Sequence, residues 1–94
     1  MSEAKTVRVI IEGRVQGVWF RGWTIEQAAA RGLAGWVRNR SDGSVEAVLH
    51  GPMVTVDDMI KACRHGPPAA SVTRVSVEPS FETVGHDFHQ RPTA

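Results

Sequence analysis

The stretch between residues 13 and 21, Gly-Arg-Val-Gln-Gly-Val-Trp-Phe-Arg, constrains the fold of this chain more than any other part of the sequence. It follows a segment in which Val7, Val9 and Ile11 recur at every second position, a period typical of a half-buried strand. The glycines at 13 and 17 then predict a tight turn, and the residues beyond them predict a helix. The chain must therefore leave a strand, turn sharply and enter a helix within this one stretch.

The same stretch has the features of an anion-binding loop. Gly13 and Gly17 allow positive φ angles and close backbone approach, so successive N–H groups can point into one concavity. A helix that begins just beyond adds its own N–H groups and the positive end of its dipole. Arg21 adds a planar, permanently charged guanidinium. This pattern predicts a site for a phosphoryl group that needs no metal ion. The alternative is a plain strand-to-helix connection in which Arg21 pairs with a nearby carboxylate.

The first half of the chain predicts one helix and a hairpin after this loop. Residues 22–31 form the expected helix, with Ile25, Ala28, Ala29 and Gly32 at helical spacing on one face. A short strand is expected over residues 35–39, and the Asp-Gly pair at 42–43 predicts a hairpin turn. In the following strand one face is expected to hold three apolar side chains, those of Val45, Ala47 and Leu49.

The second half predicts one more helix and one clear strand. Thr55 is the expected N-cap of the helix, and residues 66–68, Gly-Pro-Pro, end it. The helix carries an apolar stripe of Val56, Met59, Ile60 and Cys63. A strand follows over residues 72–77, with Thr73, Val75 and Val77 on one side, and a short strand is possible near Phe88.

The order strand-helix-strand-strand-helix-strand indicates an α+β fold of the ferredoxin-like, split βαβ type, an antiparallel sheet with two helices on one face. With 94 residues the chain is long enough for one domain over 1–94, with a core over about residues 6–91 and loose ends.

Composition and charge exclude several classes of function. Eleven basic and ten acidic residues give a net charge of +1, which argues against a broad nucleic-acid surface. The sequence has no apolar run near the roughly 20 residues that cross a bilayer, and its first residues lack an apolar signal core. Its single cysteine, Cys63, forbids an internal disulfide. We expect a cytoplasmic protein without a membrane or nucleic-acid partner.

Few other residues predict chemistry. Asn39, at the end of an expected strand, can hold a water molecule through its amide or simply cap the turn that follows. The four histidines lack metal-ligand spacing, so neither a metal nor a cofactor is expected. Cys63 fits a buried apolar position, and the tryptophans fit core packing and loop anchoring.

Two blocks of sequence resemble the acylphosphatase family. They are residues 12–21, Glu-Gly-Arg-Val-Gln-Gly-Val-Trp-Phe-Arg, and residues 32–46, of which 32–39 and 42–46 carry the resemblance. Residues 66–72 also match, so the resemblance spans about residues 7–78. It implies a monomeric, metal-free hydrolase that cleaves the bond between a carboxyl group and phosphate. It further implies that Asn39 positions the attacking water, and that Arg21 binds the phosphoryl group together with the loop amides of Val15, Gln16, Gly17, Val18, Trp19 and Phe20.

Two features depart from the family's pattern. Arg40 stands where many members carry a small hydroxyl residue, and the segment from Phe88 to Pro92 is polar where the family's last strand alternates apolar residues. The polar segment predicts a weak last strand and a loose sheet edge. These departures keep one alternative open, a module that binds a phosphorylated or anionic ligand without turnover. A second alternative is an RNA-binding split βαβ domain, and its weak point is the missing basic face.

Overall fold

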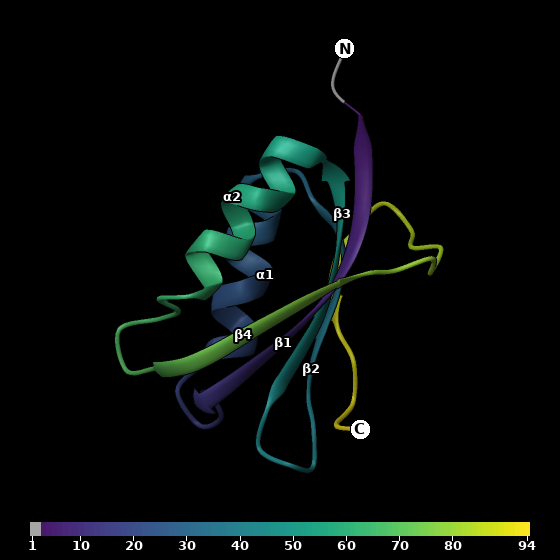
Figure 1. Cartoon of the computed structure of the whole chain (residues 1–94). Helices are drawn as coiled ribbons and strands as arrows, with labels where there is room; N and C mark the ends of the chain where they lie inside the picture. Colours follow the sequence, from purple (N-terminus) through teal and green to yellow (C-terminus); the bar gives the residue numbers. More distant parts are fainter. Residues whose placement is uncertain (1–2) are drawn as a thin grey trace.

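The computed structural model describes residues 3–94 and contains the predicted order βαββαβ followed by a short fifth strand. Both helices cover the same face of one sheet (Figure 1). None of the helices in residues 3–94 is long and apolar enough to cross a membrane. The elements are β1 (Ala4–Arg14), α1 (Phe20–Ala30), β2 (Ala34–Asn39), β3 (Val45–Pro52), α2 (Met53–Cys63), β4 (Ser71–Pro79) and β5 (Phe88–Gln90).

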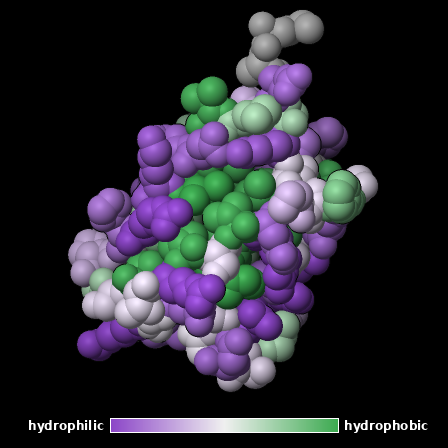
Figure 2. Space-filling model, in the orientation of Figure 1, coloured by the Kyte–Doolittle hydropathy of each residue, from purple (hydrophilic) through white to green (hydrophobic). Residues whose placement is uncertain are grey.

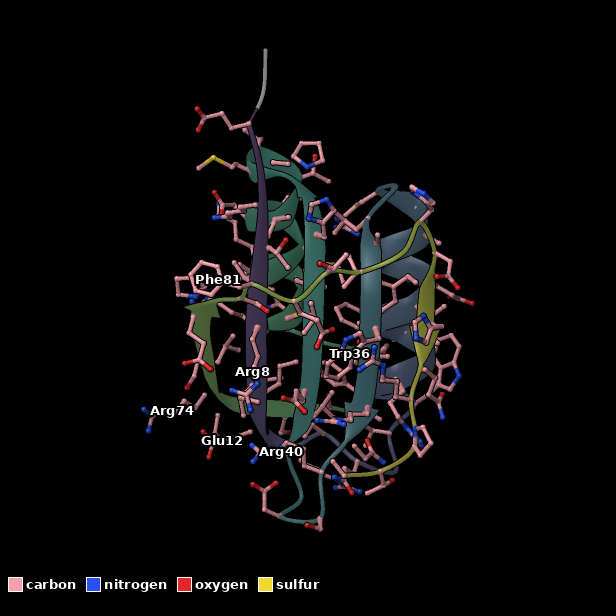
Figure 3. All side chains as sticks on the ribbon, turned by 90° about the vertical axis from the view of Figure 1, so that its right-hand side faces the viewer. Arg8, Glu12, Trp36, Arg40, Arg74 and Phe81 are labelled. Atoms are coloured by element: carbon pink, nitrogen blue, oxygen red, sulfur yellow. The ribbon has the colours of Figure 1, made fainter. Side chains whose placement is uncertain are left out.

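The sheet has the strand order β4-β1-β3-β2-β5 and is mixed rather than purely antiparallel. The four long strands pair antiparallel as predicted, whereas β5 pairs parallel with β2, with Val37 opposite Gln90. After β4 the chain crosses the sheet face that carries no helix and then runs along β2 in the same direction (Figure 3). This crossover makes the last pair parallel and brings the end of the chain beside Asn39.

The core lies between the sheet and the two helices. The strands fill it with the predicted alternating residues, among them Val9, Ile11 and Val45, which are fully buried. The stripe predicted for α2 is confirmed, because all four of its residues are buried. On α1 the predicted face is right for Ala28, which is buried, and for Ile25, which packs partly against the core, but Ala29 and Gly32 are exposed. Phe20 and Thr24 are buried in addition, because the helix begins earlier than expected and the Thr24 hydroxyl donates to the Phe20 carbonyl at 2.7 Å, which lets a polar residue enter the core.

The expected N-cap Thr55 was also wrong, because α2 begins at Met53 and places Thr55 inside the helix. β3 continues through Gly51 and Pro52, which pair with Lys5 and Ala4 of β1. The Met53 N–H donates to the Glu3 carbonyl at 2.8 Å. The residue just before β1 therefore satisfies the first donor of α2, and no side-chain cap is needed.

A register shift between β1 and β4 changes which side chain of β4 joins the core. Val75 packs partly against the core, but Val72 does so in place of Thr73, and Val77, predicted on the same side as Val75, is exposed. The shift lies next to Gly13, where a Cβ would come within 2.8 Å of the Thr73 nitrogen. The glycine thus permits a close approach of β4.

Apolar side chains gather in the middle of the surface seen in Figure 2, with polar side chains around them.

The sheet face without helices carries charged and aromatic side chains. Glu46, only 3% exposed, accepts hydrogen bonds from Arg8 at 2.5 Å and Arg38 at 2.7 Å. Trp36 lies beside them, with the Arg38 and Arg91 guanidinium carbons 4.8 and 4.3 Å from its ring centroid (Figure 3). Its indole N–H donates to a Glu82 oxygen in the crossing segment.

Hydrogen bonds join the C-terminal segment to β2, although its side chains are polar. The Arg91 N–H donates to the Val37 carbonyl at 2.9 Å, and the Ala94 N–H donates to the Asn39 carbonyl at 3.0 Å. The Ala94 carbonyl in turn accepts from the Ser41 N–H at 2.8 Å. Backbone pairing of this kind needs no apolar side chains.

Candidate active site

The loop between β1 and α1 is anchored by apolar side chains that point into the core. Val15, Val18 and Phe20 are 1%, 8% and 2% exposed. The Phe20 ring also meets Trp23 edge-on, with 5.3 Å between the ring centroids. Trp19 does not anchor the loop as expected from the sequence, because its side chain is 60% exposed. The buried side chains of Val15, Val18 and Phe20 therefore hold the loop against the core.

Arg21 lies in the first turn of α1, where a positive charge is electrostatically unfavourable. The helix begins at Phe20, and its first turn contains no acidic residue. The positive end of the helix dipole and the N–H groups of this turn all favour an anion. None of the ion pairs formed within residues 3–94 includes Arg21, although six of the nine arginines take part in one. Pairing with a nearby carboxylate, the alternative reading of the sequence, is therefore not what the structure shows.

A pocket of about 160 Å³ brings the predicted site residues together. Arg21 lines it from the start of α1, and Asn39 lines it from the end of β2, the strand that follows α1 in the sequence. Of the predicted loop residues only Val18 does not line the pocket, since it turns into the core. The lining residues are Val15, Gln16, Gly17, Trp19, Phe20, Arg21, Gly22, Asn39 and Gln90.

Asn39 does not close the turn that follows it. Within residues 3–94 the turn is closed by Asp42, which accepts from the Ser44 N–H at 2.9 Å and from the Ser44 hydroxyl at 2.6 Å. These two hydrogen bonds lower the pKa of the Asp42 carboxyl. The half-buried Asn39 side chain instead lines the pocket, where its amide can both donate and accept.

The side chain of Gln16 has a role that the sequence did not reveal. Its amide nitrogen donates to the Arg40 carbonyl at 2.8 Å and to the Ser44 carbonyl at 2.9 Å. Both acceptors lie in the hairpin turn after Asn39. Gln16 therefore fixes the distance between the loop and the strand end that carries Asn39. Nothing in the spacing of the sequence joins residues 16 and 44.

Gln90 is a pocket residue that sequence reasoning missed. It lies in β5, opposite Val37 of β2, and thus two residues before the level of Asn39. The only available signal was the short strand suspected near Phe88. Its parallel pairing with β2, which brings Gln90 to the pocket, depends on the path of the crossing segment.

Arg40, the departure from the family's pattern, is not among the residues that line the pocket. Its side chain points to the hairpin, with a guanidinium nitrogen 3.6 Å from an Asp42 oxygen. Figure 3 shows Arg40 near the base of that hairpin. Its backbone carbonyl, by contrast, is one of the two acceptors of Gln16.

Two other candidate chemistries find no support in the side-chain geometry. Burial raises the pKa of the Cys63 thiol to about 12, so the thiolate that a nucleophile requires is not formed near neutral pH. Among residues 3–94, no group of three or more His, Cys, Asp and Glu side chains is arranged to hold a metal ion.

The model of the acylphosphatase family matches residues 7–90. The chain belongs to the acylphosphatase family. It is 56% identical to an acylphosphatase of Rhizorhabdus wittichii over 92% of this chain and 87% of that protein. It is 54% identical to an acylphosphatase of Rhodospirillum rubrum over 95% of this chain and 98% of that protein. The structure of an acylphosphatase from Coxiella burnetii superposes with a TM-score of 0.90 at 34% identity, covering 94% of this chain and 93% of that one.

Membership of the acylphosphatase family confirms the resemblance, the ferredoxin-like α+β fold and the expectation of a hydrolase that acts on acyl phosphates. It does not favour the non-catalytic binding module. The match runs through residue 90 and so includes the polar strand β5.

Proposed function

We propose that Arg21 and the amides of residues 15–20 bind the phosphoryl group of an acyl phosphate, and that Asn39 holds the water that attacks it. Arg21 lines one pocket together with five of the six loop residues, and backbone N–H groups and a guanidinium are donors suited to phosphate oxygens. Phosphoryl transfer spreads charge over three equatorial oxygens, so catalysis depends mainly on position and electrostatics. These residues provide both.

The proposed reaction adds one water to the phosphorus atom. The water oxygen forms the new P–O bond, and the bond between phosphorus and the acyl oxygen breaks. Its electron pair leaves with the carboxylate, a stable anion at neutral pH that needs no general acid. The proton lost by the water goes to a phosphate oxygen of the substrate. No protein side chain has to change its protonation state.

The observation that carries this proposal is the charge of Arg21, which no carboxylate within residues 3–94 pairs, at the same pocket as Asn39. A cation at the positive end of a helix costs free energy unless an anion binds there. An anion in the pocket offsets that cost, and the Asn39 amide then lies beside it.

Hydrolysis of benzoyl phosphate in the presence of a chelator tests the proposed function. The wild-type protein should release inorganic phosphate at an unchanged rate when the chelator is added. Asn39→Ala should lose most of kcat while its circular dichroism spectrum stays that of the folded protein. Metal-dependent turnover, or a kcat of Asn39→Ala near that of wild type, would contradict the proposed roles.

We also propose that the protein acts as a cytoplasmic monomer and that inorganic phosphate occupies the loop after turnover. Small size, one buried cysteine and a near-neutral net charge support the first statement. Sedimentation analysis should give the mass of one 10.3 kDa chain, and phosphate should inhibit competitively with substrate.

A further inference from the structure

Trp19 combines three features that the binding of a phosphoryl group does not explain. It is the one non-glycine residue with positive φ among residues 3–94, at 66°. Its side chain is 60% exposed although it is large and apolar. It also lines the pocket that holds Arg21 and Asn39. A bulky residue rarely adopts this backbone conformation, and such strain gathers at functional sites.

The indole of Trp19 rests on the first turn of α1. A Cβ built on Gly22 would lie 2.5 Å from the Trp19 Cε2 atom, so only a glycine at position 22 lets the ring take this place. The backbone conformation and the missing Cβ together hold the ring at the rim of the pocket. The ring is therefore fixed in position while much of its surface faces solvent.

The size of the pocket indicates which part of a substrate contacts the indole ring of Trp19. At about 160 Å³ it is smaller than the roughly 300–1,000 Å³ of sites that enclose a whole drug-sized ligand. Once the phosphoryl group lies against Arg21 and the loop amides, the acyl group must extend past the rim. Of the residues that line the pocket, Trp19 is the large apolar one that is exposed, because Phe20 and Val15 are buried.

We propose that Trp19 is a specificity-determining residue whose indole ring contacts the acyl group and favours aromatic acyl phosphates over acetyl phosphate. This inference rests on the proposed function and names the residue of the same site that contacts the acyl group. An indole offers an aromatic acyl group an offset-stacked or edge-on contact, whereas an acetyl group covers little of it. One such contact changes a rate or affinity by about 2- to 12-fold.

The ratio of kcat/KM for benzoyl phosphate to that for acetyl phosphate tests this role. Trp19→Asn removes the ring but keeps a residue that tolerates positive φ, and its ratio should fall by about 2- to 12-fold. Trp19→Phe keeps an aromatic ring and should retain most of the ratio. Gly22→Ala leaves Trp19 in the chain but displaces its ring, so its ratio should fall as well.

Trp23→Phe is the matched control, because Trp23 lies on the same helix but does not line the pocket, and its ratio should equal that of wild type. An unchanged ratio in Trp19→Asn would overturn the inference. An equal loss of kcat/KM with both substrates would also overturn it, since Trp19 would then only maintain the conformation of the loop. If the wild-type protein hydrolyses neither substrate, the proposed function itself fails, a result distinct from an unchanged ratio.

Discussion

At the scale of single residues, side chains that we do not propose as phosphate ligands hold the candidate site together. Gln16 is the clearest case, since its amide joins the loop to the hairpin carbonyls of Arg40 and Ser44. A pattern of glycines and an arginine predicts an anion-binding loop, but it cannot say how that loop is held against another strand. The contact joins positions far apart in the sequence, and only the folded sheet brings them together.

Gln16→Met tests this contact with a side chain of similar length that cannot donate. Each lost hydrogen bond contributes about 0.5–1.5 kcal/mol, so the free energy of unfolding should fall by about 1–3 kcal/mol. kcat should fall as well, because Asn39 is no longer held at a fixed distance from the loop. Urea unfolding and steady-state kinetics measure the two effects.

Gln27→Met is the control for Gln16→Met. Gln27 lies on α1 and its side chain accepts only from Arg31 at 2.8 Å, away from the pocket. Gln27→Met should lower the free energy of unfolding slightly and leave kcat unchanged. A full kcat for Gln16→Met would mean that the loop keeps its position without this amide.

At the scale of elements, the hairpin of β2 and β3 is held by charges on the sheet face without helices. Burial of Glu46 opposes its ionisation, but hydrogen bonds from Arg38 and Arg8 outweigh that effect and lower the pKa of its carboxyl. Arg38 directly precedes Asn39. The ion pairs therefore fix the strand end that carries the proposed water-binding residue. Alternation predicted these strands, yet no sequence pattern indicated a buried carboxylate between two arginines.

The lowered pKa of Glu46 makes stability depend on pH. Its charged form stabilises the folded state above the ordinary pKa of 4.5, and this contribution is lost as the pH falls through the lower pKa of the folded state. Glu46→Gln should therefore lower the free energy of unfolding at pH 7 by about 2 kcal/mol. Its stability should also change less than that of wild type between about pH 5 and pH 3.

Glu12→Gln is the comparison for Glu46→Gln, measured by urea unfolding across the same pH range. Glu12 lies in an exposed pair with Arg74 at 3.8 Å, and such pairs contribute about 0–1 kcal/mol. Identical pH profiles for Glu46→Gln and wild type would show that the buried pairs do not stabilise the hairpin.

The C-terminal segment is a second element whose role the sequence did not predict. Deletion of residues 91–94 removes three backbone hydrogen bonds to residues 37–41 and the guanidinium above Trp36. The free energy of unfolding should fall by about 2–5 kcal/mol. kcat should fall too, since the Asn39 carbonyl loses the hydrogen bond from the Ala94 N–H.

Arg91→Ala separates the two parts of that effect, because it keeps the backbone hydrogen bonds and removes the contact with Trp36 and the 3.8 Å ion pair with Glu82. It should cost about 1 kcal/mol and leave kcat near that of wild type. If the deletion had no larger effect than Arg91→Ala, the backbone pairing of this segment would be irrelevant to the site.

At the scale of the whole molecule, local patterns predicted the main layout and non-local contacts decided the rest. Alternation and helical stripes gave four strands and two helices, and the loop residues and Asn39 lie at one pocket. The details that differed have tertiary causes. The parallel β5 follows from the crossing segment, the α2 start at Met53 from the Glu3 carbonyl just before β1, and the place of Val72 from a register shift at Gly13.

The central claim is that an unpaired arginine at a helix start binds the phosphoryl group during hydrolysis. Arg21→Lys tests it most directly, because lysine keeps the charge but cannot offer the planar pair of donors. We expect kcat/KM for benzoyl phosphate to fall by about 10²–10³-fold, the cost of losing one donor to a developing oxyanion, with the folded spectrum intact. A kcat/KM within a few-fold of wild type would contradict the account.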